Sequence, residues 1–422
     1  MSQTDEQPPP GADPPPPPPP PPEEQRRKLY ALIAVVLGII VLSLFTGAFP
    51  AVAFVLAIIV SVLIHEGGHL IAARKSGVKA TEYFVGFGPR ILSVKRGETE
   101  YGVKAIPAGG YVKILGMNNM EPGVDPEDEP RTYRQASYPK KLAMTAAGIC
   151  THFVIAFLLL MVAWTVIGVP NGDKPSLVVG TISRLKTGPS PAEQAGFKLG
   201  DRIVSVDGQS ITSWKQLPPY IRARPGQVIT FVVERAGQDL TLQATPVDGN
   251  PDGEKVGFVG IGSKLDTERV NPIVGIGRSA EDLGQLTVGS VKALGSFFAP
   301  GSLKDYGSSI TGKPQTDPNA RPISVVGVTR IANKAGLFDF FSLLIMLNVF
   351  FGVFNAVPLP PLDGGHIALA TYERIRSRKG VRYQADAQKL IPVAAAVLVV
   401  LVILGASTVL MDIIRPVANP FQ

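Results

Sequence analysis

Long apolar stretches are the dominant feature of the chain. They lie at residues 29–45, 49–73, 142–169, 337–357 and 391–410. Each approaches or exceeds the ~20 residues that a helix needs to cross about 30 Å of hydrocarbon, and lipid offers the backbone no hydrogen-bond partners, so we expect five membrane-spanning helices. Thr46, Gly47 and Pro50 separate the first two stretches, which predicts a helical hairpin.

Basic residues flank these stretches in clusters. They precede the first, follow the second, precede the third and separate the fourth from the fifth: Arg26, Arg27, Lys28, Arg74, Lys75, Lys79, Lys140, Lys141, Arg374, Arg376, Arg378, Lys379, Arg382 and Lys389. The positive-inside rule places them all in the cytoplasm, and an alternating path through five spans satisfies this rule. We therefore expect a multi-pass protein of the cell membrane with a cytoplasmic N-terminus, an extracytoplasmic C-terminus and an extracytoplasmic segment from 170 to about 336.

Two regions between the spans have the pattern of strands. Residues 83–89 and 99–113 predict a cytoplasmic, membrane-associated β-hairpin or meander. In the outer segment, residues 178–182 and 229–233 have strand character and a short helix begins at Ala192, which together predict a small α+β domain. Residues 280–298 predict an amphipathic helix at the outer membrane face.

The expected fold is a polytopic α-helical membrane protein with a membrane-associated β element and an extracytoplasmic α+β domain. We divide the chain into a proline-rich cytoplasmic tail (1–28), the first two spans (29–75), the β region (76–140), the third span (141–169), the α+β domain (170–250), a juxtamembrane region (251–336), the fourth span (337–372), a basic loop (373–390) and the last span with its tail (391–422). An unbroken proline run at 14–22 predicts that the N-terminal tail is disordered.

The composition agrees with a membrane protein. Of the residues, 45% are hydrophobic and only 18% are charged, whereas about 25% are charged in typical soluble domains. The net charge of +7 is spread among acidic residues beside apolar runs, so we expect no nucleic-acid partner. Cys150 is the single cysteine, so any metal site must be built from Asp, Glu and the four histidines.

The motif His65-Glu66-Gly67-Gly68-His69 is the sharpest chemical signal, and it lies near the end of an apolar stretch. A spacing of four places both imidazoles on one helix face, so that both can bind one zinc ion while Glu66 acts as a general base. Ionisable residues within an apolar span are costly and normally face a protein interior or a water-filled cavity. The motif therefore predicts a catalytic zinc site.

Asp363 is the candidate third ligand, because a catalytic zinc ion needs a third protein ligand and an open position. Pro358, Pro360 and Pro361 break the helix just before it. Backbone groups freed by such a break are tolerated at membrane depth only where they line a cavity or meet a substrate. In the expected topology the second span runs inward to His69 and the fourth inward to Asp363, so both reach the cytoplasmic side.

These two motifs, with the α+β domain between them, resemble the bacterial branch of the site-2 protease family of intramembrane zinc metalloproteases. The resemblance covers about residues 61–410 and includes H-E-x-x-H and N-x-x-P-x-P-x-L-D-G in successive apolar segments. It implies a Zn²⁺ ion bound by His65, His69 and Asp363, with Glu66 as the catalytic acid/base. The residues that it implies near the substrate are Asn355, Pro358, Pro360, Gly109, Gly110 and Tyr111.

The α+β domain has its own resemblance. Residues 190–197, 200–203 and 206–208 are similar to a PDZ domain of the bacterial protease type, which captures peptide ends or extended segments by adding a strand to a sheet edge. The alternative is a packed β-rich domain without a ligand.

The family resemblance implies hydrolysis of peptide bonds in or near the membrane segment of single-span membrane proteins, after another protease has trimmed the outer domain. Anti-sigma factors are the implied substrate class, and remnant signal peptides are a second one. The PDZ-like domain would filter substrates by size or dock them.

The roles of the two remaining histidines, His152 and His366, and two alternative functions of the protein also have to be considered. His152 replaces an asparagine that is usual in the family, and we expect it to make a hydrogen-bonded helix contact. His366 follows the expected zinc ligand Asp363 and is expected to orient its neighbours. The alternative functions are a non-catalytic membrane scaffold that recruits partners through the PDZ-like domain and a different membrane H-E-x-x-H peptidase, such as a prenyl-protein processing enzyme.

Overall fold

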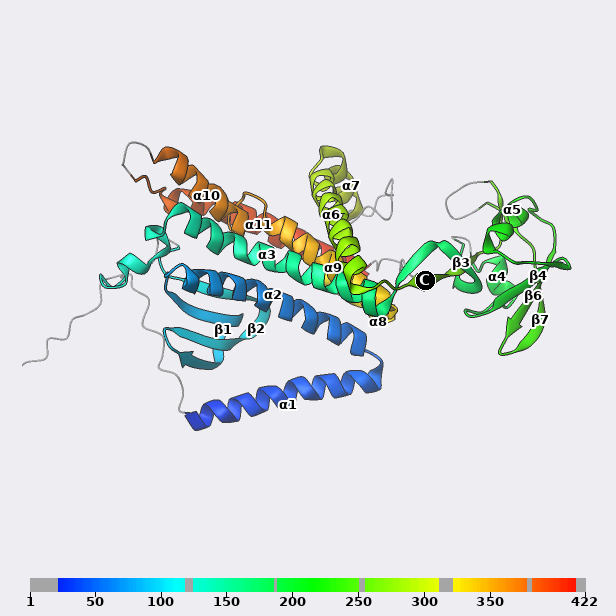
Figure 1. Ribbon diagram of the computed structural model, residues 1–422, viewed down its shortest axis with the longest axis horizontal. Coiled ribbons are helices and arrows are strands. Elements are labelled where there is room, and N and C mark those ends of the chain that lie inside the picture. Colours follow the sequence, from blue (N-terminus) through cyan, green and yellow to red (C-terminus); the bar gives the residue numbers. More distant parts are fainter. Residues whose placement is uncertain are drawn as a thin grey trace, which may run out of the picture. The chain divides into compact units, whose positions relative to one another are not determined.

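The computed structural model describes residues 22–117, 124–185, 188–249, 255–310, 322–377 and 382–414. Residues 1–21 of the expected proline-rich tail lie outside this part. Five helices in the described residues are long and apolar enough to cross a membrane, as predicted. They are α1 (Pro22–Thr46), α2 (Phe49–Lys75), α3 (Tyr138–Val162, continued by a π-helical turn to Ile167), α9 (Leu337–Asn355) and α11 (Ile391–Ile414) (Figure 1).

Two predicted boundaries of these helices are corrected. Helix α1 begins at Pro22 rather than at residue 29, because Pro22 suits a first helical turn and Glu24 pairs with Lys28 one turn later at 2.8 Å. The expected span at 337–372 is two helices, since the prolines end α9 and the chain restarts as α10 (Asp363–Arg376). The expected basic loop at 373–390 consequently begins inside α10.

The predicted β-hairpin consists of β1 (Ala80–Arg96) and β2 (Thr99–Ile114). Both strands fold back, so that Tyr83 pairs with Tyr101 on one side and with Val112 on the other, while Ser93 pairs with Gly102. The segments therefore lie in the order 90–96, 99–104, 82–85 and 110–113. Segment 110–113 forms an edge of this sheet and pairs on one side only within the described strands.

Helix α2 is the central element of the unit that comprises residues 1–160 and 277–418. It packs against β1, β2, α1, α9 and a further helix, α8 (Val325–Lys334), and the hairpin lies along it in Figure 1. Phe54 of α2 is fully buried against Ile331, Ala332 and Leu343. Burial of this apolar face fixes the helix that carries the H-E-x-x-H motif.

The described residues of the region that was expected to be juxtamembrane include three helices. The predicted amphipathic helix at 280–298 is longer, as α6 (Pro272–Phe297), and α7 (Pro300–Ile310) and α8 follow it. Ser324 caps α8 by accepting the Gly327 N–H at 3.2 Å.

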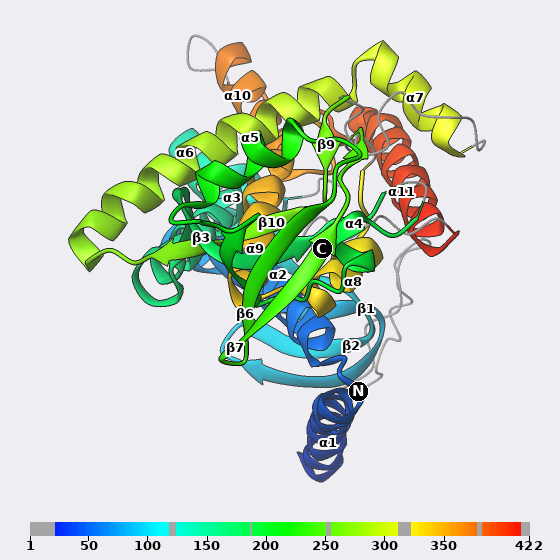
Figure 2. The same cartoon turned by 90° about the vertical axis from the view of Figure 1, so that its right-hand side faces the viewer.

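Residues 161–276 form a second compact unit built on a six-stranded sheet. Its strands are β3 (Val169–Ile182), β4 (Arg202–Val206), β5 (Gln209–Ser210), β6 (Ile229–Arg235), β7 (Gln238–Ala244) and β10 (Ile261–Glu268), in the order β10-β3-β4-β6-β7 with β5 paired to β4. Figure 2 shows β6 and β7 side by side. The short helices α4 (Pro191–Gln194) and α5 (Leu217–Arg222) and the small ladder of β8 (Val247–Asp248) with β9 (Gly257–Phe258) complete the unit.

The core and the boundary of this unit follow from side-chain alternation. Ile229, Phe231 and Val233 alternate inward along β6 and are fully buried. The expected boundary at residue 250 is wrong, because β10 completes the sheet by pairing Ile261 with Ile182 of β3. The α+β domain therefore extends to Glu268, within what was expected to be the juxtamembrane region.

Candidate metal centre

Helix α2 brings the two histidines of the motif onto one buried face. His65 and His69 are 7% and 5% exposed, and their Nε2 atoms lie 3.2 Å apart. Gly68 allows α3 to approach this face, because a Cβ atom there would lie 2.9 Å from the Ala147 carbonyl oxygen. Gly148 of α3 has the same role, because its Cβ atom would lie 2.7 Å from Cε1 of His65. Backbone of α3 thus packs directly against both imidazoles.

Asp363 reaches the same point from the first turn of α10. Its Oδ2 atom lies 3.3 Å from Nε2 of His65, and its Oδ1 atom lies 3.3 Å from Nε2 of His69. Gly364 and Gly365 follow it and are buried against the backbone of the 356–362 segment, where a side chain would clash. These glycines let the helix restart tightly after the proline-broken segment and present the carboxylate.

The three side chains suit a zinc ion. Their ligand atoms all lie within 4.8 Å of one another. The two Nε2 atoms lie 3.2 Å apart, and each lies 3.3 Å from one of the two carboxylate oxygens of Asp363. These separations are close to the spacing of roughly 3.3 Å between donors that lie about 2.0–2.1 Å from a tetrahedral ion. Two imidazoles and one carboxylate are also the donor set of known catalytic zinc sites.

Hydrogen bonding at His69 supports this fit. Its Nδ1 atom lies 2.7 Å from the carbonyl oxygen of Met144. A carbonyl only accepts, so Nδ1 carries the proton and Nε2 of the neutral ring has a free lone pair. That lone pair lies beside Nε2 of His65 and Oδ1 of Asp363, where a cation would satisfy all three. Carbonyl-oriented histidines of this kind are usual at metal sites.

Glu66 lies between the histidines in sequence and is half-buried. A Cβ atom on Gly110 would lie 3.4 Å from Cγ of Glu66, so the 110–113 edge of the hairpin runs beside the glutamate. Of the expected substrate residues here, Gly109 precedes the edge with φ +132° and Gly110 lies beside the glutamate, whereas the ring of Tyr111 stacks within the hairpin.

Tyr111 has structural partners in the hairpin. Its hydroxyl donates to the Glu82 carboxylate, and its ring stacks on Phe84 and Phe87 with centroids 5.8 and 6.0 Å away. Burial and the bond to Glu82 raise the pKa of Tyr111 well above its usual range. The phenol is therefore neutral and serves to hold the hairpin together.

The expected substrate residues near Asp363 lie around the break between α9 and α10. Asn355 is the last residue of α9, while Pro358 and Pro360 lie in the segment that joins the helices. Pro358 is exposed and Pro360 is half-buried. The hydrogen bonds and ion pairs of the described residues connect none of the three to His65 or His69.

His152 makes the helix contact that was expected of it. Its Nδ1 atom lies 3.0 Å from Oδ1 of Asn348 on α9, its ring centroid lies 4.8 Å from that of His65, and it is 2% exposed. Neither Asn348 nor Met144 was predicted to be a site residue. A side-chain amide in the middle of the apolar run of α9 was a usable signal for Asn348. Met144 contributes only a backbone carbonyl, for which the sequence holds no signal.

Comparisons with known proteins agree with this geometry. The model of peptidase family M50 matches residues 53–402. "Zinc metalloprotease Rip1" of Mycobacterium bovis is 36% identical over 400 residues, covering 87% of this chain and 97% of the relative. "Putative zinc metalloprotease Atu1380" of Agrobacterium fabrum is 28% identical over 347 residues, covering 78% and 87%.

A PDZ domain of an SdrC-like protein from Listeria monocytogenes is similar to part of this chain, with 18% identity, a TM-score of 0.18 and coverage of 21% of this chain and 87% of that one. The assignment of the whole chain rests on the family model and on the Rip1 relatives, which cover most of its length. The family resemblance in the sequence is therefore confirmed, and the chain belongs to peptidase family M50, the site-2 proteases, as a zinc metalloprotease.

Proposed function

We propose that His65, His69 and Asp363 bind the catalytic Zn²⁺ ion and that Glu66 is the general acid/base of an intramembrane protease. The observation that carries this proposal is the convergence of two Nε2 atoms and one carboxylate at 3.2–3.3 Å. Glu66 lies next to this cluster in α2 and beside the hairpin edge at Gly110. A scaffold without catalysis has no need for a glutamate in that position.

The protein's own residues account for the proton transfers. When bound, Zn²⁺ polarises the peptide carbonyl and acidifies the attacking water. Glu66 takes a proton from this water as its oxygen bonds to the carbonyl carbon, and then delivers that proton to the amide nitrogen as the C–N bond breaks. The Met144 carbonyl holds the proton of His69 on Nδ1 throughout, so that Nε2 keeps its lone pair.

The hairpin edge supplies a means of holding the substrate. A transmembrane helix must unwind before its peptide bonds are accessible, and an extended segment can then pair with a free strand edge. Segment 110–113 is such an edge, and Gly110 lies beside Glu66. We infer that substrate pairs along Gly109 and Gly110, with Asn355, Pro358 and Pro360 on the other side of the cleavage point.

The substrates in this proposal are single-span membrane proteins, such as anti-sigma factors or remnant signal peptides, whose outer domains another protease has removed. The five apolar helices fit a multi-pass membrane protein. The basic flanks orient the N-terminus and hairpin to the cytoplasm and the six-stranded sheet to the outside. In this arrangement the sheet domain acts as a PDZ-like dock or size filter for the trimmed outer end.

Comparison of membranes from cells with wild-type and Glu66→Gln protein tests this function. Glutamine keeps the size of the side chain but cannot take the proton, so truncated single-span fragments should accumulate while zinc stays bound. Wild-type turnover of those fragments by the Glu66→Gln protein would contradict the role given to Glu66. A Glu98→Gln variant on the exposed turn of the hairpin is a control, with fragments processed as in the wild type.

A further inference from the structure

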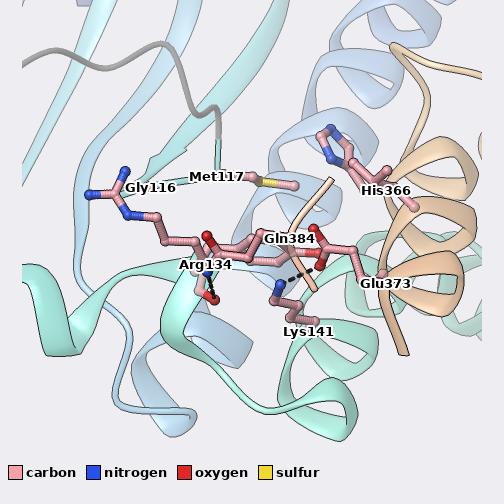
Figure 3. Close-up of a pocket in the computed structure, with 10 residues that line it drawn as sticks. Gly116, Met117, Arg134, Lys141, His366, Glu373 and Gln384 are labelled. Atoms are coloured by element: carbon pink, nitrogen blue, oxygen red, sulfur yellow. Dashed lines mark hydrogen bonds and ion pairs between the residues drawn. The ribbon is translucent and has the colours of Figure 1, made fainter. Parts of the chain in front are cut away.

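A buried ion pair joins α3 to α10 away from the candidate metal ligands. Nζ of Lys141 lies 2.7 Å from Oε2 of Glu373, and the two side chains are only 7% and 14% exposed. Figure 3 shows the two side chains pointing toward one another across a small pocket that His366 also lines. The pocket has a volume of about 20 Å³, which leaves room for little more than a water molecule.

Both members of this pair have a second contact that fixes their direction. Oε1 of Glu373 accepts the N–H of Ala385 at 3.0 Å. Nζ of Lys141 lies 5.2 Å from the centre of the Tyr133 ring, within the range of a cation–π contact. These contacts fix the orientation of each charged group. Burial of two charges is tolerated only where such a fixed geometry offsets the cost of removing them from water.

Each end of the ion pair belongs to a helix that touches the metal ligands. Lys141 precedes Met144 by about one turn of α3, and the Met144 carbonyl holds His69. In α10, Asp363, His366, Ala370 and Glu373 recur at spacings of three and four, so they share one helix face. The pair thus connects the helix that orients His69 to the helix that presents Asp363.

Other polar contacts of the described residues also bear on the position of helix α10. Thr371 lies 3.3 Å from the Tyr138 hydroxyl. The segment after α10 is joined to the segment just before α3, because Arg382 donates to the carbonyls of Arg134 and Ala136. Of these contacts only the ion pair is both charged and buried on the face that carries Asp363. Displacement of α10 by a fraction of a turn would move the carboxylate away from both Nε2 atoms.

We propose that Lys141 and Glu373 are positioning residues that set the register of α10 against α3 and so hold Asp363 at the metal. This inference rests on the proposed function, because it takes Asp363 as a zinc ligand. If the pair has this role, its loss changes the affinity and the coordination geometry of the metal site, and not only the stability of the fold. Changes to the outer partners of metal ligands typically lower metal affinity about 10–100-fold.

The test measures zinc affinity of the purified full-length protein by competition with a chelator, together with the visible absorption of the Co²⁺-substituted protein. The variants are Lys141→Met, Glu373→Gln, Lys141→Arg and the exchange Lys141→Glu/Glu373→Lys. Lys140→Met is the matched control, because Lys140 is the preceding residue, is exposed and donates to the Ser76 carbonyl at 2.9 Å.

We expect Lys141→Met and Glu373→Gln each to weaken zinc binding at least tenfold and to change the Co²⁺ spectrum. Lys141→Arg and the exchange should recover most of the affinity, and Lys140→Met should bind as the wild type does. Wild-type affinity and spectrum in both Lys141→Met and Glu373→Gln would overturn the proposal, as would equal losses in Lys140→Met. If the Lys141→Met protein does not accumulate in cells, the near-isosteric Glu373→Gln variant tests the proposal by itself.

A His65→Ala variant separates this inference from the function on which it rests. If His65→Ala binds zinc as tightly as the wild type, the proposed zinc site itself is wrong. If His65→Ala loses zinc while Glu373→Gln keeps wild-type affinity and spectrum, only the positioning role fails.

Discussion

Gly148 shows how one residue determines the space around the candidate centre. Its missing side chain leaves room for both imidazoles, because a Cβ atom there would lie 2.6 Å from Cε1 of His69 and 2.7 Å from Cε1 of His65. Heavy atoms that are not bonded do not approach so closely. The backbone of α3 is therefore part of the wall that keeps the two Nε2 atoms together.

We expect Gly148→Ala to displace the His65 and His69 rings and to lower the zinc content of the purified protein at least tenfold. Metal analysis of the purified chain measures this effect. Gly38→Ala is the control, since no atom lies within 4 Å of a Cβ atom at that position in α1. Alanine favours a helix over glycine by about 1 kcal/mol, so the control should keep its zinc. Full zinc content in Gly148→Ala would contradict the packing described.

The candidate ligands of this centre could be predicted from the sequence, whereas the groups packed around them could not. The spacing of His65 and His69 predicts a shared helix face, and the prolines before Asp363 predict a break that exposes a carboxylate. The contacts of Met144 and Gly148 could not be predicted, because they depend on the packing of α3 against α2. Such contacts between helices leave no periodic pattern in either sequence.

At the scale of elements, apolar runs predicted the five long helices well, because burial in lipid needs about 20 consecutive apolar residues. Strand β10 was missed, since Ile261–Glu268 is only partly buried and its place depends on pairing with the distant β3. The sequence also did not predict that residues 82–85 pair with a segment on each side. A straight long strand and a strand that folds back show the same alternation of apolar and polar residues.

Asp201 ties the elements of the sheet domain together. It is 1% exposed and accepts Nε and Nη2 of Arg235 at 2.7 Å and the N–H of Lys198 at 2.8 Å. Burial alone would raise the pKa of Asp201, but these bonds outweigh it and hold the pKa below its usual range. A carboxylate with a lowered pKa in the folded state stabilises the fold above its unfolded pKa of about 3.9, and this contribution is lost as the pH falls through the folded pKa.

We therefore expect Asp201→Asn to destabilise the sheet domain at pH 6 by about 1.5–3 kcal/mol, the range for hydrogen bonds to charged groups. The difference from the wild type should shrink as the pH falls below about 4. Urea unfolding followed by the fluorescence of the buried Trp214, in a Trp164→Phe background, measures it. Glu193→Gln removes an exposed pair with Arg184 and serves as the control. A difference that is constant from pH 6 to pH 3 would refute the electrostatic account.

At the scale of the whole molecule, the basic flanks predict which elements face the cytoplasm. Single cysteines in a Cys150→Ser background test this at two exposed positions, Lys95 of the hairpin and Gln209 of the sheet domain. A membrane-impermeant maleimide should label Gln209→Cys in intact cells, or in spheroplasts where an outer envelope blocks it, and should label Lys95→Cys only after lysis. Labelling in the reverse pattern would invert the proposed topology.

The central claim is that His65, His69 and Asp363 together hold the zinc ion beside Glu66. Metal analysis of the purified full-length protein tests it most directly, with wild type, each ligand changed to alanine, and Glu66→Gln. The account predicts about one zinc ion per chain in the wild type and in Glu66→Gln, and loss of zinc in His65→Ala, His69→Ala and Asp363→Ala. Zinc retained at the wild-type level in Asp363→Ala would contradict it.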